Sequence, residues 1–454
     1  MAVQKIIGGV LIMKKLNLLL AILLVSSMFL GACSSKSSGN SDEKEITFMF
    51  RGGEDEKTAY TAAIKKFEEQ HEGVKVKIIN TDADQYSTKL SAAVSGGNVP
   101  DVFYLDSGSI ANYVDNGIIR DITEDVEKAD FDLNSLWQFG VDIYRYDGDT
   151  SGKGALYGLP KDVGPFALGY NKDMFEKAGI PIPDKDKAYT WDEFLKVSQD
   201  LTQDTDGDGE VDQWASGFNA TWSLQSFAYS NGASFLNEAG DKVTVDTPEF
   251  AKSLQFFSDL SNKYNTTPNS SQAETLDTYQ RWMNGELAFF PVGPWDMSTY
   301  AKLDFEYDLM PWPSGDAGKS VAYVGSLGLV VSEMTQYPEL ATELAIYLSA
   351  DEEAQQTLLD AQVQIPNLVD MAEEWASDTE SVPSNKQEFL DIVQDYGVPY
   401  PTFATYNSQW LDEFWTNITP VVQGKKTAEE YLKEIQPKMQ KLLDEANEQA
   451  KMSK

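Results

Sequence analysis

Near its N-terminal end, at residues 45–105, the chain reads EITFMFRGGEDEKTAYTAAIKKFEEQHEGVKVKIINTDADQYSTKLSAAVSGGNVPDVFYL. Short apolar runs of the strand type alternate there with patterns of helical period, at residues 46–50, 58–70, 74–79, 86–94 and 102–105. In the first helical pattern, Tyr60, Ile64 and Phe67 fall on one face, as an amphipathic helix requires. Strands that alternate with helices predict an α/β fold, with helices covering the faces of a sheet.

Two later helices have a recognisable start. Thr190 is followed three residues on by Glu193, and Thr427 by Glu430. This spacing lets the threonine and the glutamate satisfy each other's free backbone N–H groups in a capping box. We therefore expect helices to begin directly after Thr190 and Thr427.

Composition excludes several classes of function. The 454 residues carry 72 acidic and 36 basic side chains, a formal charge of -36, and such a field repels a nucleic-acid backbone. The chain has one histidine, His71, and one cysteine, Cys33, so the usual Ser-His-Asp, Cys-His and histidine-rich metal sites are excluded. An enzyme with this composition would have to work with carboxylates.

The N-terminal segment has the pattern of a secretory signal. Lys14 and Lys15 precede the apolar run LNLLLAILLV at 16–25, and the small residues Gly31 and Ala32 precede Cys33. The motif Leu-Gly-Ala-Cys at 30–33 resembles the bacterial lipobox, in which the cysteine becomes the acylated first residue of a lipoprotein. An ordinary secretory signal with an incidental cysteine is the alternative.

We accordingly predict a signal peptide at residues 1–32, with the natural start at Met13. Cys33 would carry the lipid, and the polar residues up to 45 would form a flexible tether. Because no second cysteine is present, the folded part has no disulfide available to it.

An acidic loop at 204–212 reads DTDGDGEVD. Its oxygen ligands would stand at loop positions 1, 3, 5, 7 and 9, which are Asp204, Asp206, Asp208, Glu210 (through its backbone carbonyl) and Asp212. This spacing suits calcium better than magnesium, and we expect a structural calcium ion. The loop departs from an EF-hand at position 12, where Ala215 replaces the bidentate glutamate. A solvated acidic turn is the alternative.

Aromatic residues are abundant, with ten tryptophans, 21 tyrosines and 22 phenylalanines. Several stand near turn-forming residues, namely Tyr104, Trp222, Trp295, Trp312, Tyr323, Tyr406 and Trp410. Sugars pack their flat C–H faces on aromatic rings, and their hydroxyls need fixed polar partners. A cleft lined by rings and carboxylates would therefore suit a carbohydrate, although for any single ring burial in the core is the better explanation.

Several segments together resemble one known family, the extracellular solute-binding proteins of sugar ABC importers, to which maltose-binding protein belongs. The matching segments lie at residues 67–76, 100–102, 157–162, 170–180, 285–289, 293–295 and 325–328. They keep the family's order from about residue 45 to 450, so the resemblance covers nearly the whole mature chain.

The resemblance implies an α/β, two-lobed periplasmic-binding-protein-like fold of type II, with discontinuous lobes joined by hinge strands. The first lobe would comprise residues 42–162 plus 321–362, and the second 163–320 plus 363–454. The chain would cross between the lobes near 161–164, 319–323 and 363–366. A ligand held in the cleft would favour the closed state, which is presented to a membrane permease.

Family positions carried over to this sequence give the expected sugar-binding residues. They are Arg51, Gly53, Glu54, Tyr104, Asp106, Ser107, Asp162, Trp222, Trp295, Gly325, Ser326, Tyr406 and Trp410. Among them, Trp295 is the expected main stacking platform, and Asp162 is expected to orient sugar hydroxyls. Gly164 stands where some maltodextrin binders have a carboxylate, which argues against maltodextrin as the ligand.

The sequence thus favours a monomeric lipoprotein on the outer face of a Gram-positive type of membrane. It would bind an oligosaccharide, deliver it to an ABC permease and catalyse no reaction. Two alternatives stay open, a secreted carbohydrate-active enzyme that uses two carboxylates, and a surface sensor or adhesin on the same fold.

Overall fold

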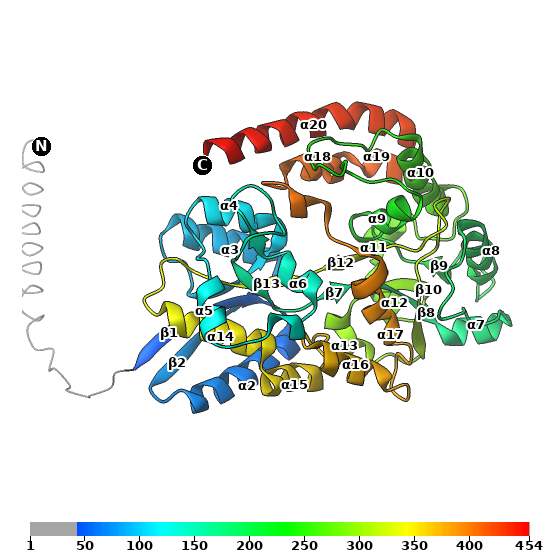
Figure 1. Cartoon of the computed structure of the whole chain (residues 1–454). Helices are drawn as coiled ribbons and strands as arrows, with labels where there is room; N and C mark the ends of the chain where they lie inside the picture. The colour runs from blue at the N-terminus through cyan, green and yellow to red at the C-terminus, as the bar shows by residue number, and fades with distance from the viewer. Residues whose placement is uncertain (1–42, 454) are drawn as a thin grey trace, which may run out of the picture. The chain divides into compact units, whose positions relative to one another are not determined.

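The computed structural model describes residues 43–453 (Figure 1). The predicted signal peptide, Cys33 and most of the tether lie outside the described residues. Within the described residues, no helix is both long and apolar enough to cross a bilayer.

The first large sheet has five strands in the order β2-β1-β3-β13-β6. Their bounds are β1 Lys44–Arg51, β2 Val74–Thr81, β3 Val102–Asp106, β6 Gly158–Pro160 and β13 Leu327–Val331. β1 runs parallel to β2 and β3, whereas β13 is antiparallel to β3 and β6. The first four residues of β3 are all buried, as expected for a central strand covered on both faces.

Helices pack beside this sheet, and the two predicted from the N-terminal pattern are longer than expected. They are α2 Glu54–Gln70 and α3 Ala83–Ser95, and two later helices are α14 Pro338–Ala350 and α15 Glu352–Asp360. The additional first turn of α2 carries three acids and no apolar residue, so apolar periodicity could not reveal it. Acids in this turn interact favourably with the positive end of the helix dipole.

The second large sheet has four strands in the order β11-β8-β10-β9. Their bounds are β8 Ala167–Asn171, β9 Trp214–Ser216, β10 Leu287–Val292 and β11 Tyr307–Met310. The main helices of this part are α7 Lys172–Ala178, α8 Trp191–Leu201, α9 Ala220–Ser230 and α10 Pro248–Asn262. α8 begins after the predicted capping box, since Thr190 accepts from the N–H of Glu193 and the Glu193 carboxylate accepts from the N–H of Thr190.

A third, small sheet lies between the two large ones in Figure 1. It pairs β7 Gly164–Pro165 and β14 Gly397–Val398 with β12 Ala322–Gly325. Shorter elements complete the fold, namely β4 Arg145–Tyr146, β5 Ala155–Leu156, α4 Ile110–Asp115, α5 Thr123–Lys128, α6 Gln138–Asp142, α11 Ser270–Thr275, α12 Thr278–Met283, α13 Met297–Tyr300, α16 Val369–Ser377, α17 Gln387–Asp391 and α19 Thr419–Val422.

Two separate hydrophobic cores follow from these sheets. The first contains Leu159 and Leu329, and the second contains Val163 and Val324. The chain therefore leaves one core and enters the other within a few residues, between β6 and β7 and again between β12 and β13. These short passages divide the described residues into two lobes.

The C-terminal helices connect the two cores. α18 Gln409–Asn417 and α20 Ala428–Met452 pack against each other, and most buried residues of α20 belong to the second core. Ala446, near the end of α20, packs in the first core instead. At about 1.5 Å per residue, a helix of 25 residues is long enough to reach both. The second lobe, expected to include all of 363–454, therefore shares this helix with the first.

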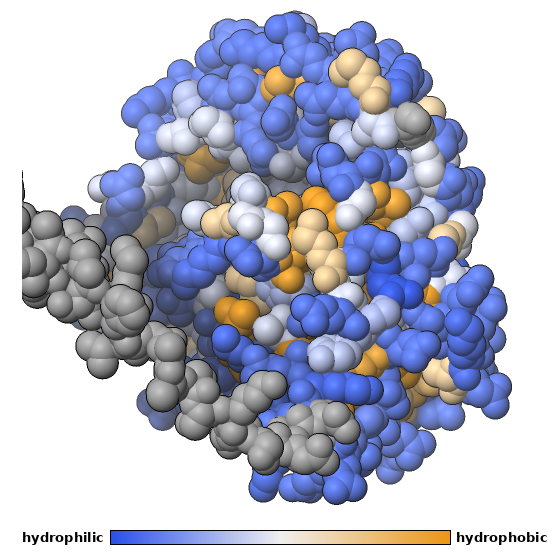
Figure 2. All heavy atoms as spheres, turned by 90° about the vertical axis from the view of Figure 1, so that its left-hand side faces the viewer, coloured by the Kyte–Doolittle hydropathy of each residue, from blue (hydrophilic) through white to orange (hydrophobic). Residues whose placement is uncertain are grey.

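The surface is mostly hydrophilic, and in the face drawn in Figure 2 the apolar residues gather near the middle. Large hydrophobic side chains of the described residues that are exposed lie at isolated positions, Ile182, Trp222, Met334, Val382 and Met452. Of these, Trp222 borders a cavity of about 480 Å³.

Candidate functional site

A cavity of about 480 Å³ lies where the two lobes and the small central sheet meet. Its lining comes from the end of β3 and the turn after it, from β12, from α9 and from the segment 399–408. The residues that contribute polar or aromatic groups include Asp106, Ser107, Ser109, Asn112, Trp222, Tyr323, Ser326, Tyr400, Thr402, Tyr406 and Asn407.

One wall of the cavity is polar and belongs to the first lobe. Asp106 ends β3 and is exposed, while the four strand residues before it are buried. Ser107 and Ser109 follow in a 3-10 turn, and Asn112 lies in the first part of α4. Because the strand ends at this edge of the sheet, its last side chains are free to face a ligand.

Arg51 fixes the Asp106 carboxylate. Its Nη2 lies 3.2 Å from Asp106 Oδ1, and the two residues end the neighbouring parallel strands β1 and β3. The Arg51 side chain is 28% exposed, and its guanidinium also stands 5.9 Å from the ring centre of Tyr86. Asp106 is thus held as an oriented carboxylate with an accessible oxygen.

The opposite wall is aromatic. Trp222 is 42% exposed, and its ring centre lies 6.0 Å from that of Tyr323 and 6.1 Å from that of Tyr400. Phe166 extends this group, with ring centres 5.8 Å from both Trp222 and Tyr323. Burial raises the pKa of Tyr400 to about 12, so this phenol keeps its proton at neutral pH. Its hydroxyl also accepts a hydrogen bond of 2.9 Å from Trp415 Nε1.

A close contact joins the two walls beside the cavity. A Cβ atom built on Gly108 would lie 2.8 Å from Thr402 Oγ1, so a larger residue would push the turn after β3 away from the segment 399–408. Gly108 therefore permits the approach of these two segments. Both border the cavity.

Besides Asp106 and Ser107, four of the expected sugar-binding residues line this cavity, and a fifth contacts Asp106. Trp222, Gly325, Ser326 and Tyr406 line it together with Asp106 and Ser107, and Arg51 contacts Asp106. Tyr406 is only 7% exposed, and its hydroxyl is 3.0 Å from Ser453 Oγ.

Other expected residues lie elsewhere. Tyr104 is fully buried, and its hydroxyl donates to Glu56 Oε1 over 3.2 Å. Trp410 is also fully buried, and its indole N–H donates to Thr405 Oγ1. The structure thus offers no ring face of either residue to a ligand. Tyr104 stands in an apolar strand, and Trp410 lies on the buried face of an amphipathic helix with Leu411 and Phe414.

Gly53 and Glu54, also expected at the sugar, lie at the exposed start of α2 and outside the cavity lining. The Glu54 carboxylate is 3.0 Å from the ammonium of Lys57, one turn further along the same helix.

Trp295, the expected main platform, is half-buried and does not line the cavity. Its ring meets Phe166 edge to face at 4.9 Å, and it occupies the space beside Gly164, where a Cβ atom would lie 3.0 Å from it. Trp295 therefore stands behind the aromatic wall and supports Phe166.

Asp162 is buried, and both of its carboxylate oxygens already have partners. Oδ1 accepts from the N–H of Leu327 over 3.1 Å, and Oδ2 lies 3.2 Å from Lys161 Nζ. In this structure the Asp162 carboxylate binds the crossing segments, and it does not line the cavity.

Several cavity residues were not among those expected. Tyr400, Asn112, Thr402 and Asn407 carry no motif in the sequence, since they come from short elements whose partners are distant along the chain. Tyr323 did have a signal, because it precedes the Gly325–Ser326 pair by two residues and was one of the aromatic residues singled out near turns.

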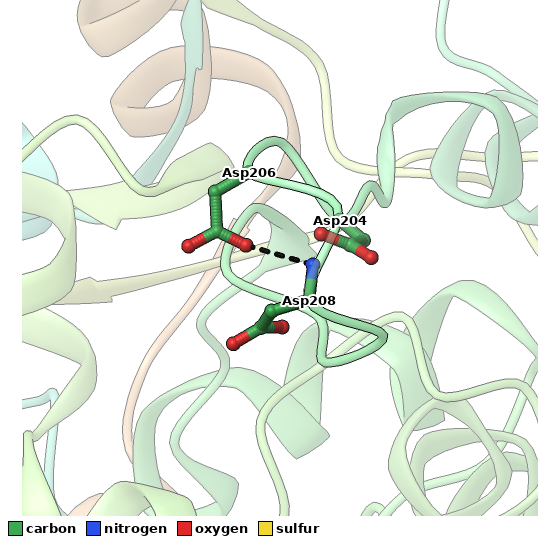
Figure 3. A group of neighbouring side chains, drawn as sticks. All are labelled: Asp204, Asp206 and Asp208. Atoms are coloured by element: carbon green, nitrogen blue, oxygen red, sulfur yellow. Dashed lines mark hydrogen bonds between the residues drawn. The ribbon is translucent and has the colours of Figure 1, made fainter.

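The acidic loop gathers three carboxylates. Oxygen atoms of Asp204, Asp206 and Asp208 lie within 4.8 Å of one another. Figure 3 shows these three side chains on the loop. The Asp204 carboxylate accepts from the N–H groups of Gly209 and Gly207, and these hydrogen bonds lower its pKa. Asp212 is turned to Thr205, whose N–H and hydroxyl it binds.

At loop position 12, Ala215 is fully buried within β9 and supplies no ligand atom. The loop therefore offers a hard cation three close carboxylates and an incomplete shell. Water would have to fill the remaining positions.

Comparison with known proteins places the chain in a family. The model of the bacterial extracellular solute-binding proteins matches residues 52–355. The chain belongs to this family. The expected resemblance is thereby confirmed.

Among curated relatives of this solute-binding protein, the arabinooligosaccharide-binding protein of Bacillus subtilis is 28% identical over 76% of this chain and 79% of the relative. The maltodextrin-binding protein MdxE of the same species is 25% identical, over 90% of this chain and 93% of the relative.

Solved structures agree on the fold. An ABC substrate-binding protein of Listeria monocytogenes in complex with cycloalternan superposes with a TM-score of 0.79 at 24% identity, covering 89% of this chain and 100% of that one. Maltose-bound MalE3 of T. maritima gives a TM-score of 0.72 at 21% identity, covering 88% and 100%. The expected two-lobed α/β binding-protein fold is confirmed.

Proposed function

We propose that this solute-binding protein captures a sugar, specifically an oligosaccharide, in the cavity between its lobes and delivers it to the permease of an ABC importer. The proposal rests on one observation. The aromatic wall of Trp222, Tyr323 and Tyr400 faces the carboxylate of Asp106 and the hydroxyl of Ser107. The volume of the cavity, about 480 Å³, also falls within the range of about 300 to 1,000 Å³ that is usual for ligand sites.

The two walls match the two kinds of surface on a sugar ring. The exposed face of Trp222 would pack against ring C–H groups, while Asp106 accepts hydrogen bonds from hydroxyls. Tyr400 keeps its phenolic proton at neutral pH, so it adds a neutral polar group and no second charge.

Closure of the lobes would follow from binding. The cavity takes residues from both lobes, so a sugar that touches both walls binds the closed arrangement more tightly than an open one. A ligand shifts a two-state equilibrium by this difference in affinity. The closed form would then be the one that a permease recognises.

The names of the relatives support an oligosaccharide, because they bind arabinooligosaccharides and maltodextrin. We further propose that the protein has no catalytic activity of its own. The alternative of a sugar sensor or adhesin shares the same site and differs only in its partner.

Anchoring is a separate part of the proposal. The lipobox-like Leu-Gly-Ala-Cys at 30–33 supports acylation of Cys33 and cleavage of the signal peptide directly before it, which would hold a monomer on the outer face of a Gram-positive membrane. One acyl chain alone binds membranes weakly, so a stable anchor requires the additional chains that lipoproteins carry.

We also propose a structural calcium ion at the acidic loop. Support comes from the three carboxylates within 4.8 Å and from the spacing of their residues. The site lies beyond the end of α8 and outside the cavity lining, so the ion would stabilise this loop and take no part in sugar binding.

A thermal-shift screen tests the main proposal. The panel would contain arabinose, arabinotriose, maltotriose and a galactosyl trisaccharide, with amino acids and short peptides as controls. At a ligand concentration of about 100 times its Kd, binding stabilises the fold by about 2.7 kcal/mol, which raises the midpoint clearly. Incubation of any hit with pure protein, followed by chromatography, would reveal turnover and thus the enzyme alternative.

A further inference from the structure

A buried lysine stands at the point where the chain first crosses between the lobes. The Lys161 side chain is 3% exposed, and its Nζ lies 3.0 Å from Glu56 Oε1 and 3.2 Å from Asp162 Oδ2. Glu56 belongs to α2 of the first lobe, and Asp162 follows Lys161 directly. One ammonium group thus holds two carboxylates at the first crossing.

Hydrogen bonds of Lys161 and Asp162 join the first crossing segment to the second. Asp162 Oδ1 accepts from the N–H of Leu327, and the Asp162 carbonyl accepts from Ser326 Oγ over 2.5 Å. The N–H of Lys161 donates to the Leu327 carbonyl over 2.7 Å. Residues 161–162 and 326–327 are therefore joined by three hydrogen bonds.

The third crossing segment is hydrogen-bonded to the first as well. Gln364 Nε2 and Asn367 Nδ2 donate to the Lys161 carbonyl over 3.0 and 2.9 Å. Gln364 also accepts from Tyr60, a fully buried residue of α2. Val363 packs in the first core and Ile365 in the second, so this segment also passes from one lobe to the other.

The charges in this network depend on one another. Burial acts against the charged form of Lys161, but Asp162 and Glu56 outweigh it and raise the pKa of the lysine. Removing the ammonium would leave two carboxylates facing each other in a buried site. Breaking a buried ion pair in this way is strongly destabilising, since an unpaired charge has lost its water.

We propose that Lys161, Glu56 and Asp162 form a hinge clamp, which holds the three crossing segments together at one point about which the lobes turn. In this assignment Asp162 is a positioning residue for lobe closure and contacts no sugar. The assignment rests on the proposed function only in that closure accompanies binding.

A matched control is available in the second lobe. The Lys386 side chain is 4% exposed, and its Nζ lies 3.4 Å from Asp378 Oδ2. It is a buried, ion-paired lysine like Lys161, but it stands on the segment before α17, away from the residues of the clamp. Lys386→Met should therefore cost stability without loosening the hinge.

Amide hydrogen exchange on the whole chain without sugar tests the clamp. In Lys161→Met we expect exchange at Lys161 and Leu327 to increase at least about tenfold, because their amides bond across the first two crossings. Exchange in the middle of β2 and β10 requires wider unfolding, so it should rise in both variants as their global stability falls, whereas exchange at the hinge should rise only in Lys161→Met. Both Lys161→Met and Lys386→Met should melt at lower temperature, so the melting midpoint alone does not decide the matter.

Asp162→Asn provides a second variant if Lys161→Met fails to fold. Its remaining oxygen can still accept from Leu327, but the attraction to Lys161 is lost, so exchange at Leu327 should rise by a smaller factor. Hinge exchange that stays at the wild-type rate in the variants, or that rises equally in Lys386→Met, would overturn the clamp. Neither result depends on which sugar binds, so failure of the clamp is distinct from failure of the proposed function.

Discussion

Arg51 and Asp106 form an ion pair of 3.2 Å that joins the carboxyl ends of two neighbouring parallel strands, β1 and β3. Asp106 lines the cavity and is 62% exposed at its side chain, whereas Arg51 is 28% exposed. The arginine thus holds a largely hydrated carboxylate in one orientation. Such a fixed acceptor favours the binding of sugar hydroxyls, because less conformational entropy is lost when the sugar binds.

Arg51→Met should weaken sugar binding and change stability little. An exposed ion pair contributes about 0 to 1 kcal/mol to folding. The Asp106 carboxylate remains but loses its fixed orientation, which should raise Kd by about tenfold, equivalent to about 1.4 kcal/mol. Calorimetry with the best sugar of the screen measures this. Arg120→Met is the matched control, since Arg120 pairs with Asp125 over 2.9 Å outside the cavity lining and should leave Kd unchanged.

Trp222→Ala should abolish much of the affinity while the protein without sugar melts almost as before. A ring that anchors a ligand commonly contributes about 2 kcal/mol or more, about 30-fold in Kd. Because Trp222 is 42% exposed, little core packing is lost. Trp410→Ala is the contrast, since that ring is fully buried and its loss should cost about 3 to 5 kcal/mol of folding free energy. Normal sugar binding by Trp222→Ala would show that the aromatic wall is not part of the binding site.

Glu388 should make stability depend on pH. Its carboxyl is buried, and burial raises its pKa to about 8, with Tyr396 donating a hydrogen bond to it. The folded state therefore binds this proton more tightly than the unfolded state, whose pKa stays near 4.5. The stabilisation is complete below about pH 4.5 and declines as pH rises towards 8. Glu388→Gln should flatten the dependence of the melting midpoint on pH over this window, and an unchanged slope would refute the assignment.

Calcium should raise the melting midpoint, and a chelator should lower it without unfolding the protein, because two large cores remain. The Asp206→Asn, Asp208→Asn double variant should lose the difference between the two conditions. Metal analysis of the purified protein is the independent readout. Equal midpoints with calcium and chelator, together with no bound ion, would mean that the loop is a solvated turn.

Cys33→Ala should abolish lipid anchoring, because the chain has no other cysteine to acylate. Labelling of cells with a palmitate analogue, followed by fractionation, measures the effect. The variant should remain uncleaved or be released to the medium without label. Label that persists in the variant would disprove the lipobox assignment.

The N-terminal pattern predicted β1, β2 and β3 of the first sheet, because these strands and the helices between them are consecutive and each carries its own apolar period; β6 and β13 come from distant parts of the chain. The capping box at Thr190 likewise predicted the start of α8, since a cap depends on residues only three positions apart. Local signals of this kind need no knowledge of the remaining chain.

The side chains that line the cavity were harder to predict, because exposure depends on distant partners. Trp222 and Trp410 are the same residue type on helices, yet one is 42% exposed and the other fully buried. Asp162 resembles a ligand residue from its place at the crossing, but Leu327 and Lys161 already bind its oxygens. Tyr400 meets Trp222 across 178 positions of sequence, and no local pattern encodes such a contact.

Isothermal titration calorimetry of the wild type, Trp222→Ala and Asp106→Asn against arabinotriose and the other sugars of the panel tests the central claim most directly. The account predicts saturable binding of an oligosaccharide by the wild type, with Kd at least about tenfold weaker in both variants while their melting midpoints stay close to the wild type. No saturable heat from any sugar, or binding that survives both substitutions, would contradict it.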